Sequence, residues 1–134
     1  MRLTSFTDYG FRALMRMAAD PGRAFSTSEL AADLRISRNH LAKVISRLAR
    51  AGILSTRRGG AGGAVLARPA GDIRLGEIAR VLEADQALVE CFADDTSACT
   101  LIRRCRLQPR LAAAERAFLA ELDRSTLADC ADLP

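Results

Sequence analysis

Three of the four cysteines lie close together, in a segment with little helical or strand periodicity. Cys91, Cys99 and Cys105 are spaced Cys-x7-Cys-x5-Cys. Thiolates are soft ligands that suit iron–sulfur clusters or zinc, and accessible thiols also act as redox groups. The spacing lacks the paired Cys-x2-Cys of common zinc sites, and a cysteine can serve as a small buried apolar side chain. The residues alone therefore leave ligation, redox chemistry and packing open for these three, and favour a structural role for Cys130.

A second set of residues has the types and spacing of a DNA reader. Arg38, Asn39 and His40 occupy the first turn of a predicted helix and offer donors and acceptors to base edges in a major groove. A shorter predicted helix precedes it across a brief turn, as in a helix-turn-helix. Hydroxyls at helix N-termini can hold phosphate oxygens. The predicted DNA-binding residues are Ser28, Ser37, Arg38, Asn39, His40, Lys43, Arg47, Arg57, Arg58 and Gly60.

Three helices should build the domain that positions this reader. Residues 5–20 carry apolar side chains on one helical face. Ser26 and Glu29 have the spacing of a capping box at the start of the short helix. The third helix, 38–51, turns apolar side chains inward, and Gly52 is placed to close it in a left-handed conformation.

A hairpin is predicted after the third helix. Two strand-like runs, 53–58 and 64–69, flank a tip with four glycines in five residues. Arg57 and Arg58 stand at the root of this hairpin, where they suit the minor groove or the DNA backbone. The backbone of the tip, Gly60 included, can approach another surface closely.

Two further helices follow, and the second has an apolar stripe. Residues 75–84 form an amphipathic helix, and Pro109 fits the first turn of a long helix that reaches residue 123. The stripe comprises Leu107, Leu111, Ala114, Phe118 and Leu122. It requires a cover, which either a second copy of the chain or the chain's own domain can provide. Ser125 should cap a short terminal helix that runs through Cys130.

Composition favours a mainly α protein with one compact core. The 134 residues are 49% apolar but only 4% aromatic, so the core should use Leu, Ile, Val and Ala. The predicted fold class is a winged helix-turn-helix DNA-binding domain with a small β-hairpin wing, plus a long C-terminal dimerisation helix. The expected limits are 1–84 for the DNA-binding domain, 85–106 for the cysteine-bearing cluster loop, and 107–134 for the dimerisation helix and tail.

The charge distribution predicts a polyanionic partner for the first half only. Residues 1–68 carry 12 Lys and Arg against 4 Asp and Glu, a net charge of +8, while residues 69–134 carry 8 against 12, a net charge of −4. Ordinary solvated surface is the alternative explanation. Neither a secretory signal nor a membrane-spanning run is visible, so we expect a cytoplasmic protein. An enzyme is not expected, because the sole histidine, His40, lies on a basic helix face.

Several segments resemble the Rrf2 family of winged-helix repressors. The likeness is carried by residues 1–10 (MRLTSFTDYG), 12–14, 37–41, 48–52, the glycine-rich wing and 73–78. Residues 88–91, 105–107, 117–119, 122–123 and 126–129 resemble the nitric-oxide-sensing repressors of that family. The resemblance implies a homodimer built on the long C-terminal helix. Each subunit would place one recognition helix and one wing on a roughly palindromic double-stranded operator.

The resemblance also implies a cofactor. In the nitric-oxide-sensing members three cysteines hold an iron–sulfur cluster, which assigns Cys91, Cys99 and Cys105 to one cluster per subunit, 4Fe–4S with 2Fe–2S as the alternative. An aspartate of the partner's first helix fills the fourth position there, and Asp8 matches it. A carboxylate is a hard ligand on a soft site, so nitric oxide should displace it readily; alternatively, Asp8 only caps its helix. The interval from Cys91 to Cys99 is longer than in the family. The histidine that a related regulator of iron–sulfur assembly uses as a ligand is replaced here by Arg106 and its neighbours.

The function implied is a repressor that releases its operator when nitric oxide nitrosylates or destroys the cluster. The alternative is a related regulator that uses the same cysteines to sense iron–sulfur status or redox state, through a 2Fe–2S cluster, zinc or a thiol switch.

Overall fold

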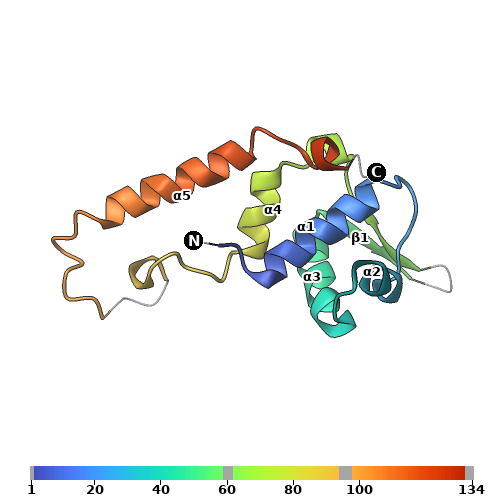
Figure 1. Cartoon of the computed structure of the whole chain (residues 1–134), viewed down its shortest axis with the longest axis horizontal. Helices are drawn as coiled ribbons and strands as arrows, with labels where there is room; N and C mark the ends of the chain where they lie inside the picture. The colour runs from blue at the N-terminus through green and yellow to red at the C-terminus, as the bar shows by residue number, and fades with distance from the viewer. Residues whose placement is uncertain (1, 59–61, 94–97, 132–134) are drawn as a thin grey trace.

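The computed structural model describes residues 2–58, 62–93 and 98–131. Its helices are α1 (Ser5–Ala18), α2 (Thr27–Leu34), α3 (Arg38–Arg50), α4 (Leu75–Leu82) and α5 (Gln108–Leu122), with 3-10 turns η1 (Ala70–Asp72), η2 (Glu90–Phe92) and η3 (Leu127–Cys130). Strands β1 (Leu54–Arg57) and β2 (Gly63–Leu66) pair in an antiparallel sheet. The chain is mainly helical with a small hairpin, as the sequence predicts (Figure 1). Among the described residues, no helix combines the length and apolar character needed to cross a membrane.

The first three helices pack around one apolar core. Leu41, Val44 and Leu48 of α3 are fully buried, together with Leu14 of α1 and Leu30 of α2. These are the inward-facing positions that helical spacing predicts. The capping box between the Ser26 hydroxyl and the Glu29 side chain is also confirmed at the start of α2.

The two helices of the helix-turn-helix end in the same way, although only one of them ends in glycine. After α3, Gly52 has φ +78°, and the N–H of the next residue donates to the Leu48 carbonyl at 3.0 Å. This is the left-handed closure predicted for Gly52. After α2, Arg35 takes the same place with φ 55°, and the following N–H donates to the Ala31 carbonyl at 3.0 Å. The turn that aims α3 therefore holds a non-glycine residue in a conformation that L side chains disfavour.

The wing is anchored by a third backbone segment. The strand register ends with Arg57 opposite Gly63. Next to it, Phe25 exchanges two backbone hydrogen bonds with Ala64, at 3.0 and 2.8 Å. A Cβ at Gly63 would lie 2.6 Å from the carbonyl oxygen of Phe25, so only glycine permits this close approach. The wing is thereby fixed to the segment that leads into α2.

The chain returns to the winged domain after α5. Leu127 is fully buried in the same core, and its N–H donates to the Ile73 carbonyl at 2.8 Å. At Gly76 of α4 a Cβ would lie 2.7 Å from the backbone of α5, so the two helices touch closely there. Arg80 pairs with both carboxylate oxygens of Asp123, at 3.0 and 2.6 Å. The C-terminal end of α5 is therefore fastened to α4.

The rest of α5 extends away from the domain as an arm (Figure 1). None of its residues is buried. Of the predicted stripe, Leu111, Phe118 and Leu122 are half-buried, Ala114 is exposed, and Leu107 is 62% exposed. The short terminal helix is a 3-10 turn, and it is capped by a box of Thr126 and Asp129 rather than by Ser125 as predicted.

Candidate nucleic-acid interface and cysteine segment

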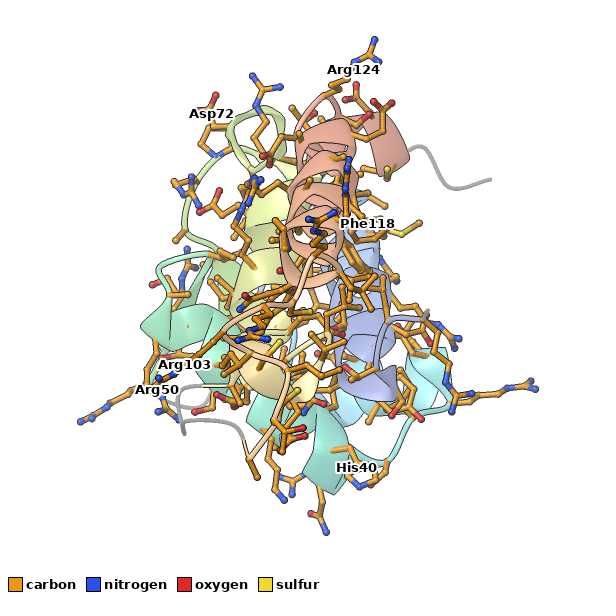
Figure 2. The ribbon with its side chains drawn as sticks, turned by 90° about the vertical axis from the view of Figure 1, so that its left-hand side faces the viewer. His40, Arg50, Asp72, Arg103, Phe118 and Arg124 are labelled. Atoms are coloured by element: carbon orange, nitrogen blue, oxygen red, sulfur yellow. The ribbon has the colours of Figure 1, made fainter. Side chains whose placement is uncertain are left out.

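The first turn of α3 presents polar side chains to solvent. The exposed residues here are Arg38, Asn39, His40 and Lys43. The Ser37 hydroxyl caps the helix and accepts from the N–H of His40 at 3.5 Å. His40 lies at the lower edge of the molecule in Figure 2, at the end remote from Arg124. This turn has the exposure that a groove-reading helix requires.

Arg38 is oriented by the preceding helix. Its Nε donates to Oγ of Ser28 at 2.9 Å, which joins the first turns of α2 and α3. This bond uses one of the five guanidinium donors, and the Ser28 hydroxyl keeps its own proton to donate. Ser28 was predicted to hold phosphate; the structure adds a positioning contact to Arg38.

Arg47 lies differently from the other predicted DNA-binding residues. Its Nη2 donates to Oδ2 of Asp85 at 2.6 Å, and its guanidinium carbon lies 4.8 Å from the ring centroid of Phe6. The side chain is 35% exposed. These contacts tie α3 to α1 and to the chain after α4, so Arg47 has a structural role that the charge pattern did not reveal. A DNA contact for it stays a prediction.

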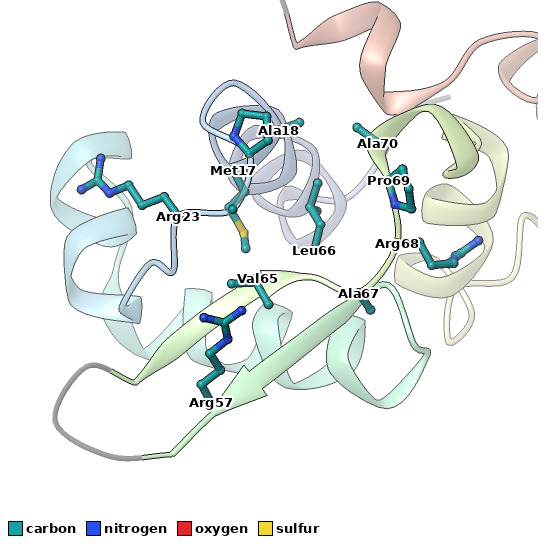
Figure 3. Close-up of a pocket in the computed structure, with 12 residues that line it drawn as sticks. Met17, Ala18, Arg23, Arg57, Val65, Leu66, Ala67, Arg68, Pro69 and Ala70 are labelled. Atoms are coloured by element: carbon teal, nitrogen blue, oxygen red, sulfur yellow. The ribbon is translucent and has the colours of Figure 1, made fainter.

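One of the two wing arginines, Arg57, lines a shallow hollow. Arg57 and Arg58 are both exposed, whereas Gly60 lies outside the described residues. A hollow of about 510 Å³ lies between the C-terminal end of α1 and the wing (Figure 3). Arg57 points toward Val65 at its edge, and Met17 contributes to its apolar lining. Arg57 therefore lies between this hollow and the outer face of the wing.

The N-terminus of α1 is held by a carboxylate from the end of α4. Oε1 of Glu83 accepts from the N–H of Thr4 and from the Thr4 hydroxyl, both at 2.8 Å, and also from the Thr7 hydroxyl. Burial acts to raise the pKa of Glu83, but the hydrogen bonds from Thr7 and Thr4 outweigh it and hold the pKa below its ordinary value. This clamp fixes the turn of α1 that carries Asp8.

Asp8 lies in the first turn of α1 but does not cap it. The cap is Thr4, whose hydroxyl oxygen accepts from the N–H of Thr7 at 3.3 Å. The alternative in which Asp8 only caps the helix is therefore wrong. Oδ2 of Asp8 instead lies 2.6 Å from Nη2 of Arg12, one turn along, and its side chain is 46% exposed. A surface pair of this kind is weak, so another cation could displace Arg12.

The cysteines are half-buried and lie outside the α-helices and strands. Cys91 lies in η2, and Sγ of Cys105 accepts from the N–H of Gln108, the first residue of α5, at 3.3 Å. Cys99 is half-buried as well. Over residues 2–58, 62–93 and 98–131, no three His, Cys, Asp or Glu side chains are arranged to hold a metal ion. A single chain thus does not bring the predicted ligands together.

Glu83 and Thr4 are the site residues that sequence reasoning missed. Threonine before a helix is a common N-cap, and this local signal could have identified Thr4. The partner carboxylate lies 79 positions away, so no local pattern could have paired the two.

Comparison with known proteins decides the family. A family model named Rrf2 and described as an iron-dependent transcriptional regulator matches residues 3–132. The chain belongs to the Rrf2 family. Its regulators bind DNA and are typically dimeric, so this protein is a DNA-binding transcriptional regulator.

Solved structures of related regulators share the fold. CymR of B. subtilis, described as its global cysteine regulator, is 29% identical with a TM-score of 0.71, covering 98% of this chain and 96% of that one. IscR of T. potens is 28% identical with a TM-score of 0.72, covering 96% and 85%. A transcriptional regulator from Listeria innocua is 33% identical with a TM-score of 0.71, covering 96% and 85%. Similarity therefore extends over nearly the whole chain.

Proposed function

We propose that this Rrf2 protein is a homodimeric repressor that senses nitric oxide through an iron–sulfur cluster, as the NsrR repressors do. The observation that carries the proposal is the position of three half-buried cysteines between the winged domain and α5, in a family described as iron-dependent. The donor set fits the cofactor, because three soft thiolates suit an iron–sulfur cluster and leave one position of a 4Fe–4S cluster open. A signal molecule can bind at that position by displacing a ligand weaker than a thiolate.

Cys91, Cys99 and Cys105 would hold one cluster per subunit, with the partner's Asp8 as the fourth donor. When bound, the cluster supplies iron that nitric oxide can attack. The exposed carboxylate of Asp8 suits this position because only a surface ion pair to Arg12 must be given up. Residues 85–106 would then bridge the winged domain of one subunit to α1 of the other.

Release of this bridge would act on the DNA reader through α1. That helix packs directly against α3, and Arg47 of α3 stacks on Phe6 of α1. When Asp8 and the cysteine segment separate, α1 loses a support and the two recognition helices lose their common spacing. Repression would therefore end on cluster loss.

At the operator, each α3 would enter a major groove of duplex DNA. Arg38, Asn39 and His40 would read base edges, with Arg38 steadied by Ser28. The remaining predicted contacts would bind the backbone or the adjacent minor groove, and they comprise Ser37, Lys43, Arg57, Arg58 and Gly60, with Arg47 as a less exposed candidate.

The arm formed by α5 would pair with its copy. Its apolar side chains Leu111, Phe118 and Leu122 are only half-buried, and nearby Leu107 is 62% exposed. Exposed apolar surface of this kind requires a cover, and a second arm has matching chemistry. The limits 1–84, 85–106 and 107–134 express this division of labour, although the residues after α5 pack on the winged domain.

Metal analysis of matched cysteine variants tests the cofactor. After anaerobic reconstitution, the wild-type protein should contain about four iron and four sulfide per subunit and absorb visible light. Cys99→Ser should lose both, whereas Cys130→Ser should retain them, because Cys130 lies in η3 outside the cysteine segment. Full iron and sulfide in Cys99→Ser, or none in the wild type, would contradict the proposal.

A thiol or zinc switch on the same cysteines is the second candidate. It is favoured by the similarity to a cysteine regulator. The same metal analysis separates the two, since a thiol or zinc switch contains neither iron nor sulfide after reconstitution.

A further inference from the structure

The C-terminal half is acidic as a whole, but its arginines are unevenly placed. Arg80 pairs with Asp123, and Arg124 pairs with Glu121. Four other arginines fall within residues 103–110, and no acidic residue occurs from 98 to 110. We call these four the arginine patch; they are Arg103, Arg104, Arg106 and Arg110. A segment with a charge of +4 thus lies in a half whose net charge is negative.

The arginine patch has no partner in the described part of the chain. All four side chains are exposed, and none of them forms an ion pair or hydrogen bond with another described residue. Two other arginines of this half, Arg80 and Arg124, lie 2.6 and 3.2 Å from carboxylate oxygens. Clustered cations without carboxylates attract a polyanion, which gains free energy by releasing its own counterions.

The segment before α5, which carries Arg103, lies toward the same side of the molecule as the first turn of α3. Figures 1 and 2 share their vertical axis, and both show the segment before α5 descending toward the side where α3 begins. Arg103 lies in the lower part of Figure 2, as does His40, while Arg124 lies at the opposite end. In Figure 1 this segment and the wing flank α3 from opposite ends. A duplex along this side would meet all three.

We propose that the arginine patch is a third DNA contact, which binds the phosphate backbone without reading sequence. The guanidinium fork matches phosphate oxygens, and phosphate contacts fix a protein's register on the duplex. The patch extends the DNA-contacting surface into the C-terminal half. The negative net charge of that half had predicted no contact with DNA there. The inference rests on the DNA binding of the Rrf2 family and is independent of the cluster and of nitric oxide.

The salt dependence of DNA binding tests the patch. The probe is a mixed-sequence duplex of about 40 base pairs, titrated from about 50 to 200 mM NaCl. Arg103→Gln/Arg104→Gln should bind more weakly at the low-salt end. Its slope of log K against log salt should be shallower by about 2 for each bound subunit, since each phosphate contact contributes about 0.9.

Two further variants keep the test decisive. Arg116→Gln/Arg124→Gln removes the same charge from exposed positions of α5 and its end, and it should leave the slope unchanged. Arg103→Lys/Arg104→Lys keeps the charge and should retain most of the slope. A wild-type slope in the Arg103/Arg104 glutamine variant, an equal fall in the α5 control, or no retention by lysine would each overturn the proposal.

Discussion

One oxygen of Glu83 joins two helices that local sequence does not connect. It accepts from the Thr4 N–H and from the hydroxyls of Thr4 and Thr7, so the end of α4 caps the start of α1. Asp8 lies on that same turn, paired only with Arg12 at the surface. The clamp holds the turn in place while leaving its acidic side chain accessible. At the residue scale, the turn of α1 that carries Asp8 is therefore fixed, whereas the Asp8 carboxylate can leave Arg12 for another cation.

Replacement of Glu83 should show how much these hydrogen bonds contribute to the free energy of unfolding. Glu83→Gln keeps the shape but removes the charge, and we expect the free energy of unfolding at pH 7 to fall by about 1–2 kcal/mol. Because hydrogen bonds hold the pKa of Glu83 below its ordinary value, its contribution is present above that value and is lost as pH falls through the folded pKa. The wild-type and variant stabilities should therefore converge once the pH has fallen below the folded-state pKa of Glu83.

Urea unfolding at pH 7 and over a series of acidic pH values measures this difference. Glu121→Gln serves as the control, because Glu121 belongs to an exposed pair with Arg124 and should change stability little throughout this series. A Glu83→Gln deficit that persists undiminished in acid would contradict the charge-based explanation.

Roles that depend on near neighbours in the chain could be predicted from the sequence. Roles that depend on residues far away in the chain could not. Gly52 and the Ser26–Glu29 box follow from nearest neighbours, and both are confirmed. No sequence pattern predicts the left-handed conformation of Arg35, because arginine has no preference for that conformation. Arg47 is predicted to contact DNA because it lies in a basic helix. Its partner in the structure is Asp85, which is 38 positions away in the chain.

At the scale of elements, the wing depends on one close backbone approach. Gly63→Ala would place a Cβ 2.6 Å from the carbonyl oxygen of Phe25, so β2 must move and the two Phe25–Ala64 hydrogen bonds weaken. We expect a loss of about 2 kcal/mol of stability and weaker DNA binding, since Arg57 lies opposite Gly63.

Thermal unfolding and duplex binding of the alanine variant give both readouts. Gly71→Ala is the matched control, because a Cβ there has no neighbour within 4 Å. If Gly63→Ala melts and binds as the wild type does, the wing is not held through Phe25.

The element boundaries were predictable wherever a period or a cap marks them. Helices α1 to α5 and the hairpin follow hydrophobic spacing, Pro109 and the glycine-rich tip. The terminal turn was placed correctly, but its cap is Thr126 instead of Ser125, because two adjacent hydroxyl residues compete for that position. Return of Leu127 to the winged core was missed, since burial by distant elements leaves no local pattern.

At the scale of the whole molecule, the proposed sensor requires two chains. The winged core is assembled within one chain, whereas the proposed cluster takes three thiolates from one subunit and Asp8 from the other. The arm α5 leaves apolar side chains without full cover. A dimer would supply the partner's Asp8 and cover these apolar side chains. The arginine patch would extend its contact with DNA beyond the first half of the chain.

The proposed mechanism is tested by following DNA binding while the cluster is lost. Anaerobically reconstituted protein bound to duplex operator is titrated with nitric oxide, and visible absorption and DNA affinity are recorded together. The proposed mechanism predicts that affinity falls in step with the cluster absorption, and that Asp8→Asn changes the amount of nitric oxide required. Unchanged DNA affinity after complete loss of the cluster absorption would contradict it.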